Sequence, residues 1–250
     1  MNFRRIKKYL AKLRQWPVHP QWLIFYQAKT RYREIGTQTK GTVLDIGCAD
    51  QYMKKYLSPQ QSYFSLDYYQ TAVRWYQTRP QVYADAQALP ITSNSIDTVL
   101  LLDVLEHLPR PDDCMAEIAR ILKPKGQLIL QVPFLYPLHD EPLDFHRWTQ
   151  YGLQHLAQRH GLQLKAQSAW GHPLETAGLL YNIALSKTLL NWIKRKNILS
   201  LLGILLPIVV ILVNLSCYIL ARFSPADSMM PYAYRLILEK VSQPEANASF

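Results

Sequence analysis

Acidic side chains at the ends of short apolar runs are the residues of this chain best suited to bind a ligand. Asp45 lies in the run Val43–Ile46, which leads into a turn of small residues that begins with Gly47. Twenty residues after Gly47, Asp67 closes a second apolar run, at the distance where nucleotide-binding sites hold a ribose diol. Asp85 can accept a hydrogen bond from an exocyclic amine, as Asp67 can from ribose hydroxyls. The spacing predicts a nucleotide-type ligand, and the alternative for each aspartate taken alone is a helix cap.

A second group of side chains, suited to acid–base chemistry, lies between residues 133 and 148. His139 and His146 are candidate general bases, and Asp140 or Asp144 could orient them. Arg147 could pair with an acidic group of a substrate or form a salt bridge with Asp144. The alternative for the whole group is a network that only fixes the loop.

The elements that must position these residues alternate between strand and helix patterns from residue 41 to residue 170. This alternation predicts an α/β fold, with a doubly wound sheet covered by helices. Strands are expected at 42–46, 62–66, 81–84, 96–102, 127–132, 162–168 and, as the last strand of the same sheet, 232–240. Helices are expected at 51–57, 70–78, 111–122 and 149–160, and a turn at 123–126.

The composition of the 250 residues excludes disorder, because 49% are hydrophobic and 18% are charged. Cys48, Cys114 and Cys217 are far apart and match no metal-ligand spacing, so no metal site is expected. A reduced, cytoplasmic compartment is the simplest interpretation.

The net charge of +10 is concentrated at the N-terminus, where residues 1–40 hold ten Lys and Arg against one acid. Between residues 3 and 13 apolar side chains recur at helical spacing among basic ones, which predicts either a helix on an anionic membrane surface or a solvated helix packed on the domain. Nucleic acid fits this pattern less well than lipid. Trp16, Trp22, Phe25 and Tyr26 follow as candidate membrane-interface anchors or parts of a lid.

Residues 198–221 carry no charge over 24 positions, which is roughly 35 Å as a helix and long enough to span a bilayer. If 232–240 completes the sheet, both ends of this segment must lie on one side of the membrane. The segment is then a re-entrant helix bent at Pro207, a hairpin with 177–193, or an interfacial helix. The alternative is a buried core helix, and Asn214 and Ser216 argue against a simple span.

Five segments in order resemble the class I S-adenosylmethionine-dependent methyltransferases of the broad small-molecule type (methyltransferase type 11-like). These segments are 43–51, 67–68, 85–97, 103–108 and 122–128. The resemblance covers 41–170 plus 232–240 and implies S-adenosyl-L-methionine as the cofactor. The cofactor-binding residues that it implies are Asp45, Gly47, Cys48, Ala49, Asp67, Tyr68, Asp85, Ala86 and Asp103. His107 is expected to line the pocket, and the catalytic candidates are His139, Asp140 and His146.

The chain departs from the family at Ala49 and Gln51, where glycine is common, which puts cofactor affinity in doubt if the turn needs a positive φ. A subgroup whose turn contains Gly-Cys-Gly-Asp-Gln-Pro-Tyr is more similar to residues 47–52. That subgroup also has a His-Asp-x-Pro-x-Asp-x-x-Arg run, similar to residues 139–147.

These features predict four parts: a basic extension at 1–40, a methyltransferase core at 41–170 plus 232–241, a membrane-associated insertion at 171–231 and a polar tail at 242–250. The leading hypothesis is a methyltransferase at the cytoplasmic membrane face acting on a lipid-linked, quinone-like or glycan-precursor molecule. A nicotinamide dehydrogenase is a second hypothesis, weakened because Gly-x-Gly-x-x-Gly would need glycine where Ala49 and Tyr52 stand. A non-catalytic membrane adaptor that retains the fold is the third.

Overall fold

The computed structural model describes residues 13–241, which pack into two compact units. The first unit contains residues up to 31, then 135–137 and 170–232. The second contains 32–134, 138–169 and the chain from 233 onward. Almost all of the basic helix expected at residues 3–13 lies outside the described residues.

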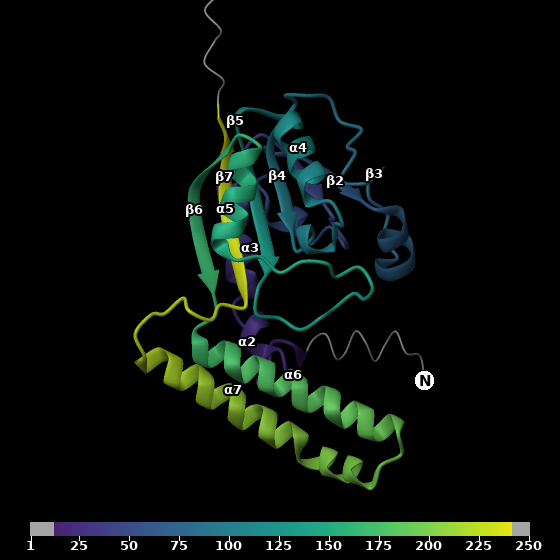
Figure 1. Cartoon of the computed structure of the whole chain (residues 1–250), viewed down its shortest axis with the longest axis vertical. Helices are drawn as coiled ribbons and strands as arrows, with labels where there is room; N and C mark the ends of the chain where they lie inside the picture. Colours follow the sequence, from purple (N-terminus) through teal and green to yellow (C-terminus); the bar gives the residue numbers. More distant parts are fainter. Residues whose placement is uncertain (1–12, 242–250) are drawn as a thin grey trace, which may run out of the picture. The chain divides into compact units, whose positions relative to one another are not determined.

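The second unit is built on a seven-stranded sheet with the order β3-β2-β1-β4-β5-β7-β6 (Figure 1). The strands are β1 (Thr42–Ile46), β2 (Ser62–Asp67), β3 (Val82–Tyr83), β4 (Ile96–Leu102), β5 (Leu122–Pro133), β6 (Leu162–Trp170) and β7 (Ala233–Lys240). The pairs from β3 through β5 are parallel, and β7 runs antiparallel to β5. The chain order therefore reverses between β1 and β4, the kind of switch point where open α/β sheets bind ligands.

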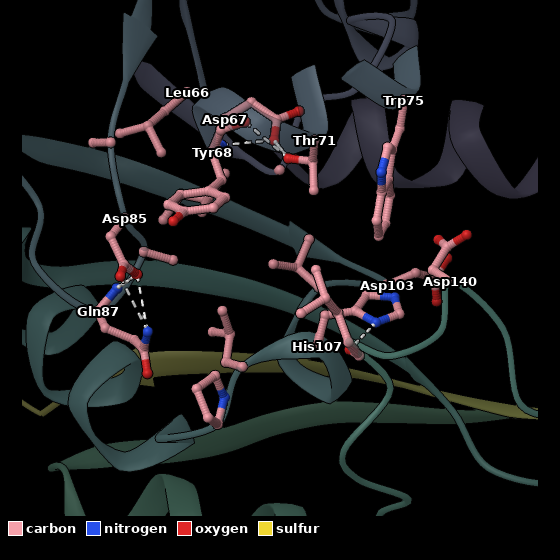
Figure 2. A pocket seen from close by; sticks show the side chains of 18 of the residues that line it. Leu66, Asp67, Tyr68, Thr71, Trp75, Asp85, Gln87, Asp103, His107 and Asp140 are labelled. Carbon is pink, nitrogen blue, oxygen red and sulfur yellow. Dashed lines mark hydrogen bonds between the residues drawn. The ribbon is translucent and has the colours of Figure 1, made fainter. Parts of the chain in front are cut away.

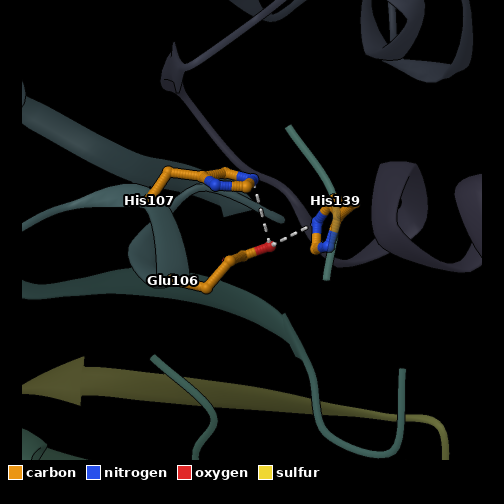
Figure 3. Close-up of side chains that lie close together, drawn as sticks. All are labelled: Glu106, His107 and His139. Atoms are coloured by element: carbon orange, nitrogen blue, oxygen red, sulfur yellow. Dashed lines mark ion pairs between the residues drawn. The ribbon is translucent and has the colours of Figure 1, made fainter. Parts of the chain in front are cut away.

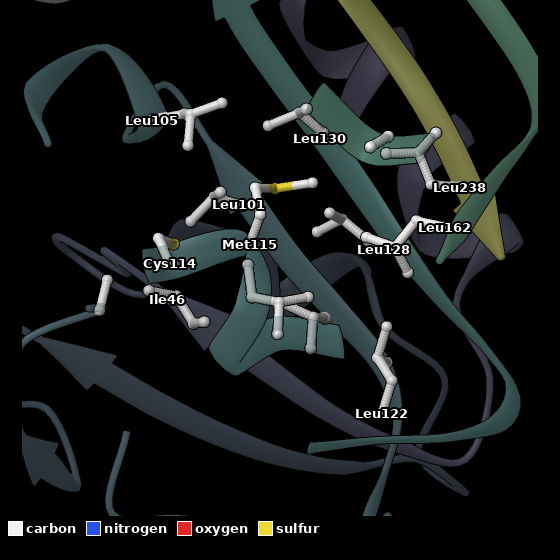
Figure 4. Close-up of a cluster of buried hydrophobic side chains, with 14 of the residues drawn as sticks. Ile46, Leu101, Leu105, Cys114, Met115, Leu122, Leu128, Leu130, Leu162 and Leu238 are labelled. Carbon is white, nitrogen blue, oxygen red and sulfur yellow. The ribbon is translucent and has the colours of Figure 1, made fainter. Parts of the chain in front are cut away.

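Alternate residues of the central strands face two different apolar layers, as the two-residue period of a strand requires. One layer joins Leu101 and Leu128 to Met115 of α4 (Pro111–Ile121) and to Leu153 of α5 (Gln150–Arg159), as Figure 4 shows in part. The opposite layer joins the intervening strand residues to Ile35 of α3 (Ala28–Gln38). The sheet is buried on both faces, which explains why its central strands are continuously apolar.

Most of the expected elements are confirmed, including the final strand of the sheet. Two expected helices and one expected turn differ, and two helices were not expected. The expected helices at 51–57 and 70–78 are a short 3₁₀ helix, η1 (Tyr52–Tyr56), and a π-helical turn, η2 (Thr71–Tyr76). Helices α2 (Trp22–Phe25) and α3 were not expected. The turn at 123–126 is instead an irregularity inside β5, because Leu122 already pairs with Ile96 before the register shifts.

The first unit is centred on a helical hairpin of α6 (Pro173–Lys194) and α7 (Leu206–Phe223). The 3₁₀ helix η4 (Ile198–Leu205) lies between the two helices in the chain and leads directly into α7. The two helices lie side by side in Figure 1. His172 caps α6 by accepting a hydrogen bond from Leu174 N, and Pro207 stands in the first turn of α7. The hairpin was one of the arrangements that the sequence left open.

Aromatic residues of the N-terminal segment pack within this same unit. Trp22 is buried, with its ring 5.5 Å from that of Tyr218 and 5.2 Å from that of Tyr26. The hydroxyl of Tyr26 donates to Glu175 at 2.9 Å. Trp22 and Tyr26 are therefore core residues of the first unit.

One polar contact is buried in the hairpin. Asn182 and Asn214 are both fully buried, and Nδ2 of Asn182 donates to Oδ1 of Asn214 at 2.9 Å. Asn214 in turn donates to the backbone oxygens of Pro17 and His19, at 2.6 and 3.0 Å. The amide that argued against an apolar span therefore faces inward, and the outer side of α7 stays apolar.

Candidate cofactor site

The turn after β1 is held in an unusual backbone conformation. Gly47, Ala49 and Gln51 have positive φ values of 70°, 44° and 57°. A Cβ on Gly47 would lie 2.3 Å from Cγ2 of Val104, so no larger residue fits there without movement. The backbone N–H of Gly47 donates to Leu66 O at 2.8 Å, which fixes the turn to the end of β2.

Asp67 closes this turn from the end of β2, and only 4% of its surface is exposed. Its Oδ2 accepts from the N–H of Ala49 at 2.9 Å, and its Oδ1 accepts from Tyr68 N at 2.7 Å and from the Thr71 hydroxyl at 2.8 Å. A carboxylate offers about four acceptor positions, so three bonds leave capacity for a ligand. Thr71 and Asp67 lie side by side in Figure 2.

A cavity of about 310 Å³ opens at this edge of the sheet and lies within the second unit. Such a volume is in the range of small-molecule and cofactor sites. Of the residues predicted from the sequence, those lining the cavity are Gly47, Asp67, Tyr68, Asp85, Ala86, Asp103, His107 and Asp140. Thr71, Trp75, Tyr76 and Gln87 also line it and were missed. Nothing in their spacing distinguishes the two aromatic residues from ordinary helix residues.

Asp85 lies on the cavity wall beyond β3, next to Gln87 (Figure 2). Its Oδ1 accepts from the backbone N–H of Gln87 at 2.8 Å and from the side-chain amide of Gln87 at 3.0 Å. These bonds orient the carboxylate, and the acceptor positions that they leave can take an amine donor.

The other predicted cofactor residues support the turn and do not line the cavity. They are Asp45, Cys48 and Ala49. Burial raises the pKa of Asp45 to about 7, and Tyr63 donates a hydrogen bond to its Oδ2 at 2.7 Å. Burial also raises the pKa of the Cys48 thiol to about 12, so this cysteine is an unreactive packing residue.

The loop after β5 forms a charged network. Arg147 makes two hydrogen bonds to Asp144, at 2.5 and 2.6 Å, and Nδ1 of His139 lies 3.3 Å from the same carboxylate. Burial alone would raise the pKa of Asp144, but the bonds from Arg147 and from the backbone of His139 outweigh it and lower the pKa to about 2. Of the catalytic candidates only Asp140 lines the cavity, whereas His146 packs against Trp148, with ring centroids 5.3 Å apart and the rings tilted by 40°.

Comparison with known proteins adds to this geometry. Residues 44–130 match the family model described as a methyltransferase domain. Over these residues, about a third of its length, the chain is similar to methyltransferase domains. An uncharacterized methyltransferase of Mycobacterium ulcerans (strain Agy99) is 34% identical over 83 residues, which are 32% of each protein. The chain therefore matches about a third of the length of that curated relative.

Solved structures support the fold. A SAM-dependent methyltransferase from Archaeoglobus fulgidus superposes with a TM-score of 0.52 at 14% identity, covering 87% of this chain and 94% of that one. The [4+2]-cyclase SpnF superposes with a TM-score of 0.54 at 16% identity, covering 87% and 82%. These two proteins are named for different reactions, so the fold alone does not decide the chemistry.

Proposed function

We propose that this protein binds S-adenosyl-L-methionine in the cavity beside Asp67 and transfers its methyl group to a small molecule. The observation that carries the proposal is that Asp67, at the end of β2, and Asp85, just beyond β3, both line the cavity and each has acceptor capacity left over. Asp67 suits the ribose hydroxyls, and Asp85 suits the exocyclic amine of adenine.

Methyl transfer from a sulfonium is an in-line displacement, so alignment and exclusion of water supply most of the catalysis. Trp75, Tyr76 and Phe145 give the cavity apolar walls that suit both tasks. A base is needed only if the acceptor is a hydroxyl group. Asp140 lines the cavity and is the predicted candidate placed to serve as one.

Cofactor titration tests the proposal. Isothermal titration of the full chain with S-adenosyl-L-methionine is expected to give saturable binding, and Asp67→Ala to reduce the affinity at least tenfold. Asp113→Ala, at a partly exposed acid of α4, is the matched control and should leave the affinity unchanged. Equal affinity in Asp67→Ala contradicts the assigned ribose site. Tight binding of NAD with none of the sulfonium cofactor would favour the dehydrogenase hypothesis.

We also propose that the methyl acceptor is membrane-resident, in the lipid-linked, quinone-like or glycan-precursor class. The segment Ile198–Phe223 is long and apolar enough to cross a membrane. Only 11% of its most apolar 18-residue stretch is buried within the protein. Ile204 is 83% exposed and Phe223 is 86% exposed. Large exposed apolar patches mark membrane or protein contacts, and the basic run 194–196 stands beside this one.

Fractionation of cells tests the membrane part separately. The full chain should sediment with membranes, and the triple variant Leu201→Lys, Ile204→Lys, Leu212→Lys should move to the soluble fraction. Tyr151→Lys places a charge at an exposed aromatic of α5 and serves as the control, which should stay with the membranes. A wild-type chain that is already soluble contradicts this proposal. Transfer of labelled methyl into membrane extract, absent with Asp67→Ala, distinguishes an enzyme from an adaptor.

A further inference from the structure

Three potential metal ligands meet beside the cofactor cavity. Glu106 and His107 lie in the 3₁₀ turn η3 (Leu105–His107), which follows β4, and His139 comes from the loop after β5 (Figure 3). One ligand atom from each residue lies within 4.8 Å of the other two. The sequence predicted no metal site, because its cysteine pattern gave none and His139 is distant in the chain.

Glu106 is a buried carboxylate without a hydrogen-bond partner among the described residues. Its side chain is 0% exposed, and neither Oε1 nor Oε2 makes a hydrogen bond. Nε2 of His107 and Nε2 of His139 lie 3.7 and 3.8 Å from Oε1, too far for hydrogen bonds. A buried carboxylate in this state is costly, and either a proton or a bound cation relieves that cost.

The backbone around Glu106 is fixed to the loop that carries His139. Its carbonyl oxygen accepts from Phe145 N at 2.9 Å and from His146 N at 3.2 Å. The backbone at Glu106 is therefore held against this loop by two hydrogen bonds.

Both imidazoles are oriented by their Nδ1 atoms. Nδ1 of His107 lies 2.8 Å from the carbonyl oxygen of Leu143, which can only accept, so the proton is on Nδ1 and the lone pair is on Nε2. Nδ1 of His139 lies 3.3 Å from the carboxylate of Asp144. Nη2 of Arg147 donates to Asp144 at 2.6 Å and also lies 3.4 Å from Nδ1 of His139, a contact in which this nitrogen accepts. The carbonyl on the far nitrogen of His107 is the arrangement of metal-binding histidines, and Asp144 is close enough to take the same role for His139.

We propose that Glu106, His107 and His139 bind a divalent transition-metal cation. Two neutral imidazoles and one carboxylate are a ligand set of three-ligand Zn²⁺ sites that keep a position open. Metal–ligand distances of about 2.0–2.2 Å place neighbouring ligand atoms roughly 3.3–3.6 Å apart. The two separations from Glu106, 3.7 and 3.8 Å, need to close by a few tenths of an ångström, and the ligand atoms of the two imidazoles lie within 4.8 Å of each other.

The position of the site suggests its use, and this part rests on the proposed function. His107 lines the cofactor cavity, so an open coordination position faces the space where the acceptor would enter. A hydroxyl group bound there would lose its proton to water more readily. The resulting oxyanion would form the O–CH₃ bond while the S–CH₃ bond breaks, leaving the neutral thioether.

Binding of Co²⁺ alone tests the site without cofactor or substrate. The full chain, freed of metal with a chelator, should bind one Co²⁺ with visible d–d absorption that Zn²⁺ displaces. His139→Gln and Glu106→Gln should each lower the Co²⁺ affinity at least tenfold. Asp144→Asn should also lower it, because Asp144 orients His139. His155→Gln, at an exposed histidine of α5, is the matched control and should bind normally.

Two results would overturn the proposal: no Co²⁺ bound by the wild-type chain, or equal affinity in His139→Gln. If Glu106→Gln fails to fold, His139→Gln still decides, because its side chain is 26% exposed and lies on a loop. A rise of the melting temperature with Zn²⁺ in the wild type and not in His139→Gln is the second measurement. Loss of metal binding with intact cofactor binding separates failure of this proposal from failure of the proposed function.

Discussion

Replacing Ala49 by glycine should stabilise the protein. Ala49 has a φ of 44°, in the left-handed region, where an L-residue costs roughly 1–2 kcal/mol relative to glycine. Glycine loses about 0.5–1 kcal/mol more conformational entropy on folding. The difference is a gain of about 0.5–1 kcal/mol in the free energy of unfolding, which corresponds to roughly 1–4 °C in melting temperature for a chain of this size.

Urea unfolding followed by circular dichroism measures this gain as a higher midpoint with an unchanged slope. Ala119→Gly is the matched control, because Ala119 lies inside α4 and the same substitution there should cost about 1 kcal/mol. The hydrogen bond from the N–H of residue 49 to Asp67 does not involve the side chain, so the cofactor affinity of Ala49→Gly should stay within about threefold of wild type.

A loss of stability in Ala49→Gly equal to that of Ala119→Gly would refute the argument from backbone strain. A large gain in cofactor affinity would show instead that the alanine methyl group obstructs the ligand. Either result bears on how this chain tolerates alanine where related turns carry glycine.

Three further substitutions probe the turn, the buried acid and the hairpin. Gly47→Ala adds a methyl 2.3 Å from Val104 at a φ of 70°, so thermal unfolding should show a loss of about 2–4 kcal/mol; a melting temperature equal to wild type would contradict it. Asp45 has its folded pKa raised by burial to about 7, so its contribution to stability is fully present below pH 4 and falls, by at most about 4 kcal/mol, as pH rises through 7. Asp45→Asn should remove this loss in cofactor-free protein, and parallel pH profiles of the two proteins would refute the assignment. Asn214→Leu leaves the buried amide of Asn182 without its acceptor, so the free energy of unfolding should fall by about 2–3 kcal/mol and limited proteolysis should cut the hairpin faster. An unchanged rate of proteolysis would show that this amide contact contributes little.

The sheet could be predicted because its signals are local. Strands buried on both faces are continuous apolar runs, and β1, β4 and the start of β2 match the expected residues. The reversal of β7 relative to β5 could not be predicted, since a strand pattern has no direction. The two unexpected helices, α2 and α3, lie in a segment whose aromatic and basic residues suggested a surface role.

The candidate site could be predicted where it depends on residues that end strands. Asp67 and Asp85 line the cavity because the carboxyl ends of parallel strands share one edge. Trp75 and Tyr76 could not be predicted, because a π-helical turn brings them to the cavity and no spacing rule indicates such turns. The meeting of Glu106 with His139 depends on the path of the loop after β5, which sequence periodicity does not encode.

The insertion between β6 and β7 closes on itself at its base. The backbone N–H of Tyr232 donates to the carbonyl oxygen of Trp170 at 2.8 Å, so the chain comes back to the point from which it left. A segment with adjoining ends can be lengthened, shortened or exchanged without changing the register of the strands that flank it. The hairpin can therefore be replaced as one piece while the sheet stays the same.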